Sequence, residues 1–378
     1  MNGGAFPRSG QVRLNARRLF GLGSLILQNS KKAALLSLAQ TDSKWRNLSG
    51  LYGLFLTFEK ENIIADAEGE DLTKLSEIVG VACGLAVLQK ESKIKLNRFS
   101  RFRPKSSAKR ADFEFYQGGN RYFHECKGTT YKYSLSTLRT DVHNQKAATK
   151  KYCKKKNMGP ALTAATGTIT VYQHQQRKDS PSRIYLIDPP VKPSTDRPKM
   201  HDELLAVLHY YQNYYEVTHI RPKNYDLIGL AAWLKQVISD VQAGHEPPTS
   251  PPSDKRLIRK ARVSEPNKPG SLYKGTIFDA RISQISVRKF STFEEATRNI
   301  IDPVSFIGVS EEVTSIIVEC RWADLLEFSD QNSLELSDNS EIFDSGIMVK
   351  SIALSAEEER QSQAMFEQQR VRYIQNKK

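Results

Sequence analysis

The chain has 378 residues, of which 39% are hydrophobic and 26% charged, which is typical of two or three folded domains and excludes a disordered chain. Its formal net charge is +14, although residues 301–360 hold 14 acidic and only 3 basic residues. Such a basic protein attracts polyanions, so nucleic acid is the expected partner; a simply basic, soluble protein is the alternative. The four cysteines contain no CxxC pair, which excludes a zinc knuckle and favours a reducing, cytoplasmic location.

Residues 1–60 are expected to form a helical N-terminal region. No acidic residue precedes Asp42, and four arginines precede the apolar stretch Leu19–Leu27, as in some targeting segments. No small-residue cleavage site follows, so we expect a basic helical arm that stays attached. The longest apolar run, Ile78–Leu88, is too short to span a bilayer, and no membrane association is expected.

Residues 61–192 contain the elements that matter most for function. Apolar residues at helical spacing predict a helix that Asp71 caps and that ends near Lys90. The pattern then changes to aromatic residues and alternation, which predicts strands. The later elements expected here are a strand, the two strands of a hairpin, a helix capped by Ser136, and two further strands: Lys95–Arg103, Ala111–Gln117, Arg121–Lys127, Ser136–Lys155, Gly167–Gln173 and Arg183–Ile187.

The remaining chain is expected to form a helical extension and a C-terminal α/β region. Residues 193–245 predict two helices broken at Pro222, and the four prolines of Glu246–Asp254 indicate a linker. Residues 255–378 form the C-terminal region, with two strand-rich segments followed by a terminal helix: Ser271–Ser286, Val304–Cys320 and Ala356–Gln375. The role of this region stays open; its acidic surface is a candidate contact for a partner protein, and homo-oligomer formation is an alternative.

The predicted hairpin places two acidic side chains and one lysine on the same face of its two strands. If Gly118-Gly119 form a two-residue turn, Gln117 pairs with Asn120 and Asp112 lies directly opposite Glu125. Lys127 shares the face of Glu125 because side chains alternate along a strand. A three-residue turn would break this register, so the prediction depends on the turn.

Two opposed carboxylates repel each other, and a bound divalent cation would remove that penalty. Carboxylate oxygens suit Mg²⁺ or Mn²⁺, so Asp112 and Glu125 are candidate metal ligands. Lys127 would orient or deprotonate an attacking water, or neutralise developing negative charge. The alternative is a solvated hairpin face with a surface ion pair. The pattern acid-x-Lys alone is weak, since it occurs three times in the chain.

The segment RADFEFYQGGNRYFHECKGTT resembles the PD-(D/E)xK, or restriction-endonuclease-like, nuclease superfamily. The resemblance covers the chain from about Asp71 to Pro190 and implies an α/β core, with a mixed central sheet flanked by helices. It implies catalytic roles for Asp112, Glu125 and Lys127, although Ala111 replaces the proline of the motif. The implied activity is Mg²⁺-dependent hydrolysis of phosphodiester bonds by an endonuclease, with DNA as the substrate and restriction or phage defence as the setting.

The resemblance adds two residues to the candidate catalytic set. In the family the first helix often supplies a further acid to the metal site, which makes Glu77 a candidate ligand; an exposed helix acid is the alternative. A glutamine after the ExK motif supports the active site in several branches, and Gln145, with Tyr152 two turns later, resembles it. Ordinary helix packing explains Gln145 equally well. His124 is expected to be a packed histidine.

Basic residues on both sides of the hairpin in the sequence are candidates for phosphate contacts. The predicted set is Arg101, Arg103, Lys109, Arg110, Lys146, Lys150 and Lys151. Each cluster is open to the alternative of a solubilising face. Two further functions compete with the enzyme: a catalytically inactive member of the superfamily that binds nucleic acid or assembles with other subunits, and a structural protein that binds a basic partner.

Overall fold

The computed structural model describes residues 11–27, 38–102, 111–117, 120–131, 134–155, 162–178, 181–187, 200–217, 225–250, 273–330 and 340–377. The chain forms two compact units, and each combines stretches that are far apart in the sequence. The first comprises residues 1–35, 57–213 and 238–247; the second comprises residues 36–56, 214–237 and 248–378. Helices and mixed or antiparallel sheets occur in the described parts, so the expected α/β class is confirmed.

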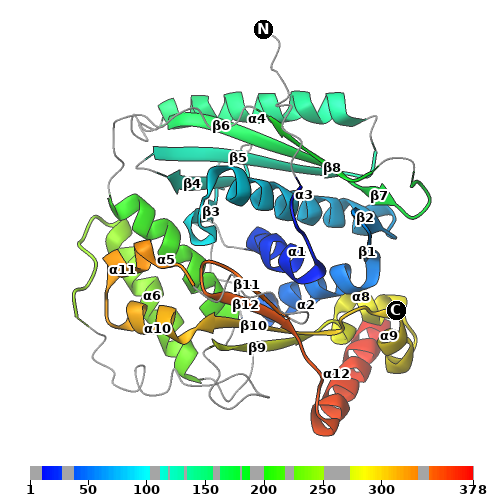
Figure 1. Ribbon diagram of the computed structural model, residues 1–378. Coiled ribbons are helices and arrows are strands. Elements are labelled where there is room, and N and C mark those ends of the chain that lie inside the picture. The colour runs from blue at the N-terminus through cyan, green and yellow to red at the C-terminus, as the bar shows by residue number, and fades with distance from the viewer. Residues whose placement is uncertain are drawn as a thin grey trace. The chain divides into compact units, whose positions relative to one another are not determined.

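A five-stranded mixed sheet forms the centre of the first unit, in the order β3-β4-β5-β6-β8. Its strands are β3 (Phe99–Arg101), β4 (Phe113–Gln117), β5 (Asn120–Thr129), β6 (Leu162–Val171) and β8 (Arg183–Ile187). β5 and β6 run parallel, and the other neighbours are antiparallel. Helices α3 (Gly69–Ser92) and α4 (Leu135–Lys155) lie on opposite sides of the sheet (Figure 1).

Alternation along the strands decides what each helix covers. On the side of α4, Val142 packs with Ile169 and Val171 of β6 and with Ile187 of β8. On the side of α3, polar side chains are buried and joined by hydrogen bonds. His124 of β5 makes hydrogen bonds to both Thr166 and Thr168 of β6, with distances of 2.7 and 3.0 Å.

Helix α3 approaches β5 unusually closely, because glycines face each other at the contact. A Cβ atom placed on Gly80 would lie 2.5 Å from the backbone nitrogen of Gly128, and one on Gly128 would collide with the carbonyl of Ser76. Neither backbone can give way without moving the helix or the strand. Helix α3 confirms the helix predicted from the apolar spacing. Its N-cap is Glu68 and not Asp71, which lies in the first turn.

Replacing Gly80 with alanine should destabilise the first unit. In an unobstructed helix this change stabilises by about 1 kcal/mol. Here overpacking against backbone outweighs that gain, with an expected net loss of about 2 kcal/mol. Thermal unfolding monitored by circular dichroism measures the effect. The control is Thr73→Ala on the exposed side of α3, which should change stability by less than about 0.5 kcal/mol; equal stability of the two variants would contradict the close packing.

The N-terminal region is helical only in part. Helices α1 (Ala16–Gly23) and α2 (Leu38–Phe55) agree with the prediction, and Leu19 and Leu22 of α1 are fully buried. The residues after α2 form strands and not helix: β1 (Leu56–Glu59) and β2 (Asn62–Ala65) join β7 (Gln173–His174) in a small sheet. The helical prediction for residues 1–60 was wrong at β1, which pairs with β2; β2 lies beyond that region and pairs in turn with β7, more than a hundred residues later. Similarly, in the described part of the predicted strand Lys95–Arg103, the residues in a β-strand are Phe99–Arg101, after a 3-10 turn at Leu96–Arg98.

The two helices expected between residues 200 and 243 are present as α5 (Met200–Val217) and α6 (Tyr225–Gln242). Pro222, at which the two helices were predicted to break, lies outside the described residues. None of the helices in the described ranges combines the length and apolar character needed to cross a membrane.

An antiparallel sheet in the order β11-β12-β10-β9 organises the second unit. Its strands are β9 (Tyr273–Asp279), β10 (Val304–Ser310), β11 (Ser340–Ile342) and β12 (Ile347–Ser351). The segment after β10 was predicted as strand, but it forms helix α10 (Glu311–Val318). Ser310 caps this helix through a hydrogen bond from the Val313 N–H, and two acidic residues occupy its first turn. Helix α11 (Trp322–Glu327) follows.

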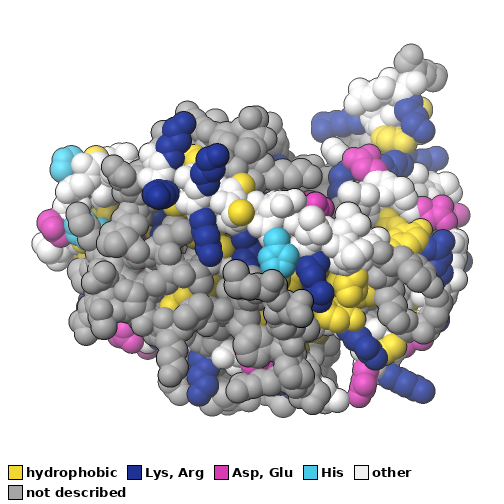
Figure 2. Space-filling model, turned by 90° about the horizontal axis from the view of Figure 1, so that it is seen from above, with side chains coloured by type: hydrophobic (Ala, Val, Ile, Leu, Met, Phe, Trp, Pro, Cys, Tyr) yellow, Lys and Arg dark blue, Asp and Glu magenta, His cyan; other side chains and the backbone are white. Residues whose placement is uncertain are grey.

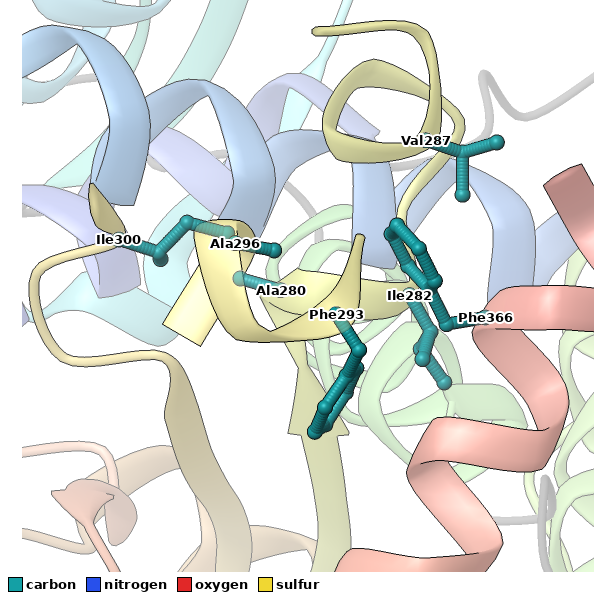
Figure 3. Packing of buried hydrophobic residues seen from close by; sticks show 7 residues of the cluster. All are labelled: Ala280, Ile282, Val287, Phe293, Ala296, Ile300 and Phe366. Atoms are coloured by element: carbon teal, nitrogen blue, oxygen red, sulfur yellow. The ribbon is translucent and has the colours of Figure 1, made fainter. Parts of the chain in front are cut away.

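The terminal helix, α12 (Ala356–Gln375), agrees with the predicted range and is fixed at its N-terminus by a capping box of Ser355 and Glu358. Its Phe366 is fully buried among residues of the α8 (Gln284–Lys289) and α9 (Phe293–Asn299) region (Figure 3). The other members of this cluster are Ala280, Ile282, Val287, Phe293, Ala296 and Ile300. Several acidic residues of the C-terminal region are exposed, namely Glu312, Glu319, Asp324, Glu327 and Glu357; their contact with a partner stays a prediction.

Candidate active site

The hairpin of β4 and β5 has the predicted register. Gln117 pairs with Asn120 and Phe113 pairs with His124, so two residues separate the strands at the turn, as expected. Gly118 and Gly119 themselves lie outside the described residues. Asp112 directly precedes β4, and its N–H donates a hydrogen bond of 3.0 Å to the carbonyl of His124. Asp112 lies one residue beyond the last pair of this register, close enough to Glu125 for its charge to act on that carboxyl; the direct pairing of Asp112 with Glu125 stays a prediction.

Both oxygens of the Asp112 carboxylate have a positively polarised neighbour. The backbone N–H of Cys126 donates a hydrogen bond of 3.1 Å to Oδ2. The Nη1 atom of Arg101 lies 3.7 Å from Oδ1, within ion-pair range. These contacts fix the direction of the carboxylate before any ligand binds.

Glu125 is a buried carboxylate in an unfavourable environment. Its side chain is only 1% exposed, and Lys127 Nζ lies 2.5 Å from its Oε1. Burial and the neighbouring negative charge of Asp112 raise the pKa of Glu125 to about 8, although Lys127 and Arg101 oppose the shift. Burial works to lower the pKa of Lys127, but Glu125 outweighs it and the pKa is raised.

The residues present fit a divalent cation. Within the described part of the chain, neither buried oxygen of Glu125 receives a hydrogen bond of normal geometry, and Asp112 is close enough for its charge to act on Glu125. Two carboxylates whose charges disfavour each other are stabilised by a shared hard cation. The side chains of Asp112 and Lys127 are 24% and 25% exposed, so the pair is reachable from one side.

Helix α4 holds this arrangement from above the sheet. The N–H of Ala111 donates a hydrogen bond of 2.9 Å to Thr149 Oγ1, which anchors the residue before Asp112. Val142 of the same helix packs against β6. A Cβ atom placed on Gly167, which pairs with Glu125 in the sheet, would collide with the Val142 side chain. Gln145 is buried between these two contacts along the helix, over the strands that carry both acids.

The anchor at Thr149 is testable by Thr149→Val, which keeps the shape and removes the acceptor. The buried N–H of Ala111 then loses its partner, at an expected cost of about 1–3 kcal/mol. Because Asp112 is held less firmly, affinity for Mn²⁺ should fall several-fold. Calorimetric unfolding and Mn²⁺ titration measure the two effects. Thr140→Val on the exposed side of α4 is the control and should change neither.

Of the two residues that the resemblance adds, Glu77 is exposed and Gln145 is buried. Glu77 is exposed on α3, next to Ser76, whose carbonyl lies against Gly128. Among the described residues, no third aspartate, glutamate, histidine or cysteine joins Asp112 and Glu125 in a metal-binding group. A ligand role for Glu77 therefore stays a prediction. Gln145 lies on the expected sheet-facing side of α4, and its part in catalysis is likewise untested.

The predicted phosphate contacts need one correction. Arg101 and Lys146 are buried, at 4% and 5% exposure, so they do not belong to an exposed basic surface. Lys150 and Lys151 are exposed on α4, and Figure 2 shows Lys and Arg side chains on the face where α4 lies in Figure 1. The exposed basic side chains of α4 are Arg139, Lys150, Lys151, Lys154 and Lys155. Arg103, Lys109 and Arg110 lie outside the described residues.

A second buried ion pair near the site was missed by the sequence analysis. Glu114, on the same side of β4 as Asp112, pairs with Arg121 of β5, and Ser100 of β3 donates a 3.1 Å hydrogen bond to it. Because side chains alternate along a strand, the sequence already indicated that Glu114 shares this face with Asp112. His124 is fully buried on the opposite face, and burial lowers its pKa to about 3, which confirms the expected packed histidine.

A comparison of the chain with protein-family models, with curated proteins and with solved structures finds no match.

Proposed function

We propose that this protein is a divalent-metal-dependent nuclease that hydrolyses phosphodiester bonds, with DNA as the substrate. The observation that carries the proposal is the proximity of Asp112, Glu125 and Lys127: Lys127 pairs with Glu125, and the charge of Asp112 acts on both. The order α3, β3–β5, α4, β6, with β5 parallel to β6, supports it further, because this is the arrangement that the PD-(D/E)xK resemblance implies. The basic balance of the chain outside residues 301–360 suits a polyanionic substrate.

Asp112 and Glu125 would hold the cation, and Mg²⁺ or Mn²⁺ suits their oxygens. When bound, the ion supplies a Lewis acid that polarises a phosphate oxygen and favours ionisation of the attacking water. In hydrolysis the water oxygen bonds to phosphorus, and the bond from phosphorus to one sugar oxygen breaks while that oxygen takes up a proton.

The protein's own groups supply orientation and charge. The Cys126 N–H keeps Asp112 directed toward Glu125. Lys127 reaches the open side of the site, where its ammonium neutralises the negative charge that develops on the phosphate, or orients the water. Helix α4 covers the strands and excludes bulk water, which strengthens these electrostatic interactions. A role in defence against foreign DNA fits such an activity and rests on the resemblance alone.

Supercoiled plasmid tests the proposal. The wild-type protein should nick or linearise it with Mg²⁺ and not with EDTA, and Asp112→Asn should abolish cleavage. Asp324→Asn, at an exposed position of α11, is the matched control and should cleave like the wild type. Plasmid that is bound but never cut, with any divalent metal, would contradict the enzyme and favour the inactive nucleic-acid-binding module. A partner protein that stays bound after nuclease treatment, without DNA binding, would favour the structural role.

A further inference from the structure

Arg101, the last residue of β3, is a buried positive charge beside the proposed metal site. Its side chain is 3% exposed, its guanidinium carbon lies 4.9 Å from the centre of the Phe113 ring, and Nη1 is 3.7 Å from Asp112 Oδ1. A guanidinium stays protonated at all ordinary pH values, so this charge is permanent. Burying it is costly, and the ion pair with Asp112 is one of the interactions that offset the cost.

The charges of the four groups balance. Asp112 and Glu125 contribute two negative charges, and Arg101 and Lys127 contribute two positive charges. A phosphodiester and an attacking hydroxide add about two negative charges, which one divalent cation neutralises. A second divalent cation would add two positive charges next to a buried guanidinium, which is unfavourable at low dielectric.

We propose that the site works with one divalent cation and that Arg101 takes the place of a second. This inference rests on the proposed function and specifies its metal requirement. In two-metal sites the ions lie about 3.5–4 Å apart and share a carboxylate. The buried guanidinium lies beside Asp112 Oδ1, so a second ion bound to that oxygen would lie against a fixed positive charge. Because Arg101 acts through Asp112, it is a positioning residue and not a surface contact for phosphate.

The count of bound ions tests the inference without turnover. Mn²⁺ is titrated into the full-length protein without nucleic acid, and the free ion is measured by electron paramagnetic resonance. The wild type should bind one Mn²⁺ that Asp112→Asn abolishes. Two such ions would overturn the inference and leave the proposed nuclease intact, whereas no bound ion would overturn both.

Substitution of Arg101 gives the second arm of the test. Arg101→Gln removes the repulsion while the Cys126 N–H still holds Asp112, so it should bind Mn²⁺ at least about tenfold more tightly or accept a second ion. Arg101→Lys keeps the charge and should bind one Mn²⁺ with affinity within about threefold of the wild type. Arg98→Gln, which loses the ion pair with Glu203, is the matched control and should leave Mn²⁺ binding unchanged.

Unchanged or weaker Mn²⁺ binding by a folded Arg101→Gln protein would overturn the inference, because a merely structural arginine predicts that result. If Arg101→Gln does not fold, the wild-type count and the Arg101→Lys affinity decide the question. Circular dichroism establishes folding for each variant.

Discussion

Replacing Lys127 with alanine should reduce plasmid cleavage by at least about 100-fold, with DNA binding nearly unchanged. Lys127 is the only residue of the acid–acid–lysine set that brings positive charge to the open side of the site, at 25% exposure. Its loss removes an interaction that strengthens as negative charge develops on the phosphate. A single side chain contributes little to the total phosphate contact, so ground-state affinity should stay within about threefold.

Single-turnover cleavage rates with Mg²⁺, together with DNA affinity measured by fluorescence anisotropy with Ca²⁺, separate the two effects. Lys74→Ala on the outer side of α3, where the lysine pairs with Glu70, is the control for loss of one positive charge. A Lys127→Ala protein that cleaves at the wild-type rate would contradict the proposed role of the ammonium.

Replacing Glu125 with glutamine should make the metal-free protein more stable at pH 8 and inactive at any pH. The pKa of the Glu125 carboxyl, about 8 in the folded protein, exceeds its ordinary value of 4.5. Between these values the folded state retains a proton that the unfolded state releases, so wild-type stability falls as pH rises. The loss is absent below about pH 4.5 and complete above about pH 8. Glutamine has no such proton and avoids the loss.

The stabilisation is limited by Lys127, which loses its ion-pair partner. Because the Lys127 side chain is partly exposed, water compensates much of that loss, whereas nothing compensates the buried carboxylate. The expected net gain at pH 8 is about 2–4 kcal/mol. Calorimetric Tm values in EDTA should be similar at pH 5, and Glu125→Gln should unfold several degrees higher at pH 8.

The control for this prediction is Glu70→Gln, an exposed residue paired with Lys74, which should change stability by less than about 0.5 kcal/mol at both pH values. A Glu125→Gln protein that is less stable than the wild type at pH 8 would show that the carboxylate stabilises the fold. The site would then be a structural ion pair.

Local patterns in the sequence predict the hairpin and several helices. The glycine pair and the alternation of side chains predict one register, and the pairs from Gln117–Asn120 to Phe113–His124 follow it. The terminal helix Ala356–Gln375 and the strand Arg183–Ile187 have their predicted bounds, and the helix begins at a capping box, which acts over a few residues.

Interactions between distant segments are what the sequence could not predict. The short strand β2 exists through its pairing with β7, and Arg101 meets Asp112 only after β3 aligns with β4. The β-branched residues of α10 favour a strand, but the Ser310 cap and packing against β10 override that preference. The exposure of each lysine on α4 likewise depends on which face of the helix meets the sheet.

Crystals soaked in Mn²⁺ test the central claim most directly. The anomalous signal should place one manganese ion between Asp112 and Glu125, with an oxygen of each in its coordination sphere and Lys127 displaced from Glu125. Manganese bound only elsewhere, with the Lys127–Glu125 ion pair intact, would contradict the claim that these two acids form a metal site.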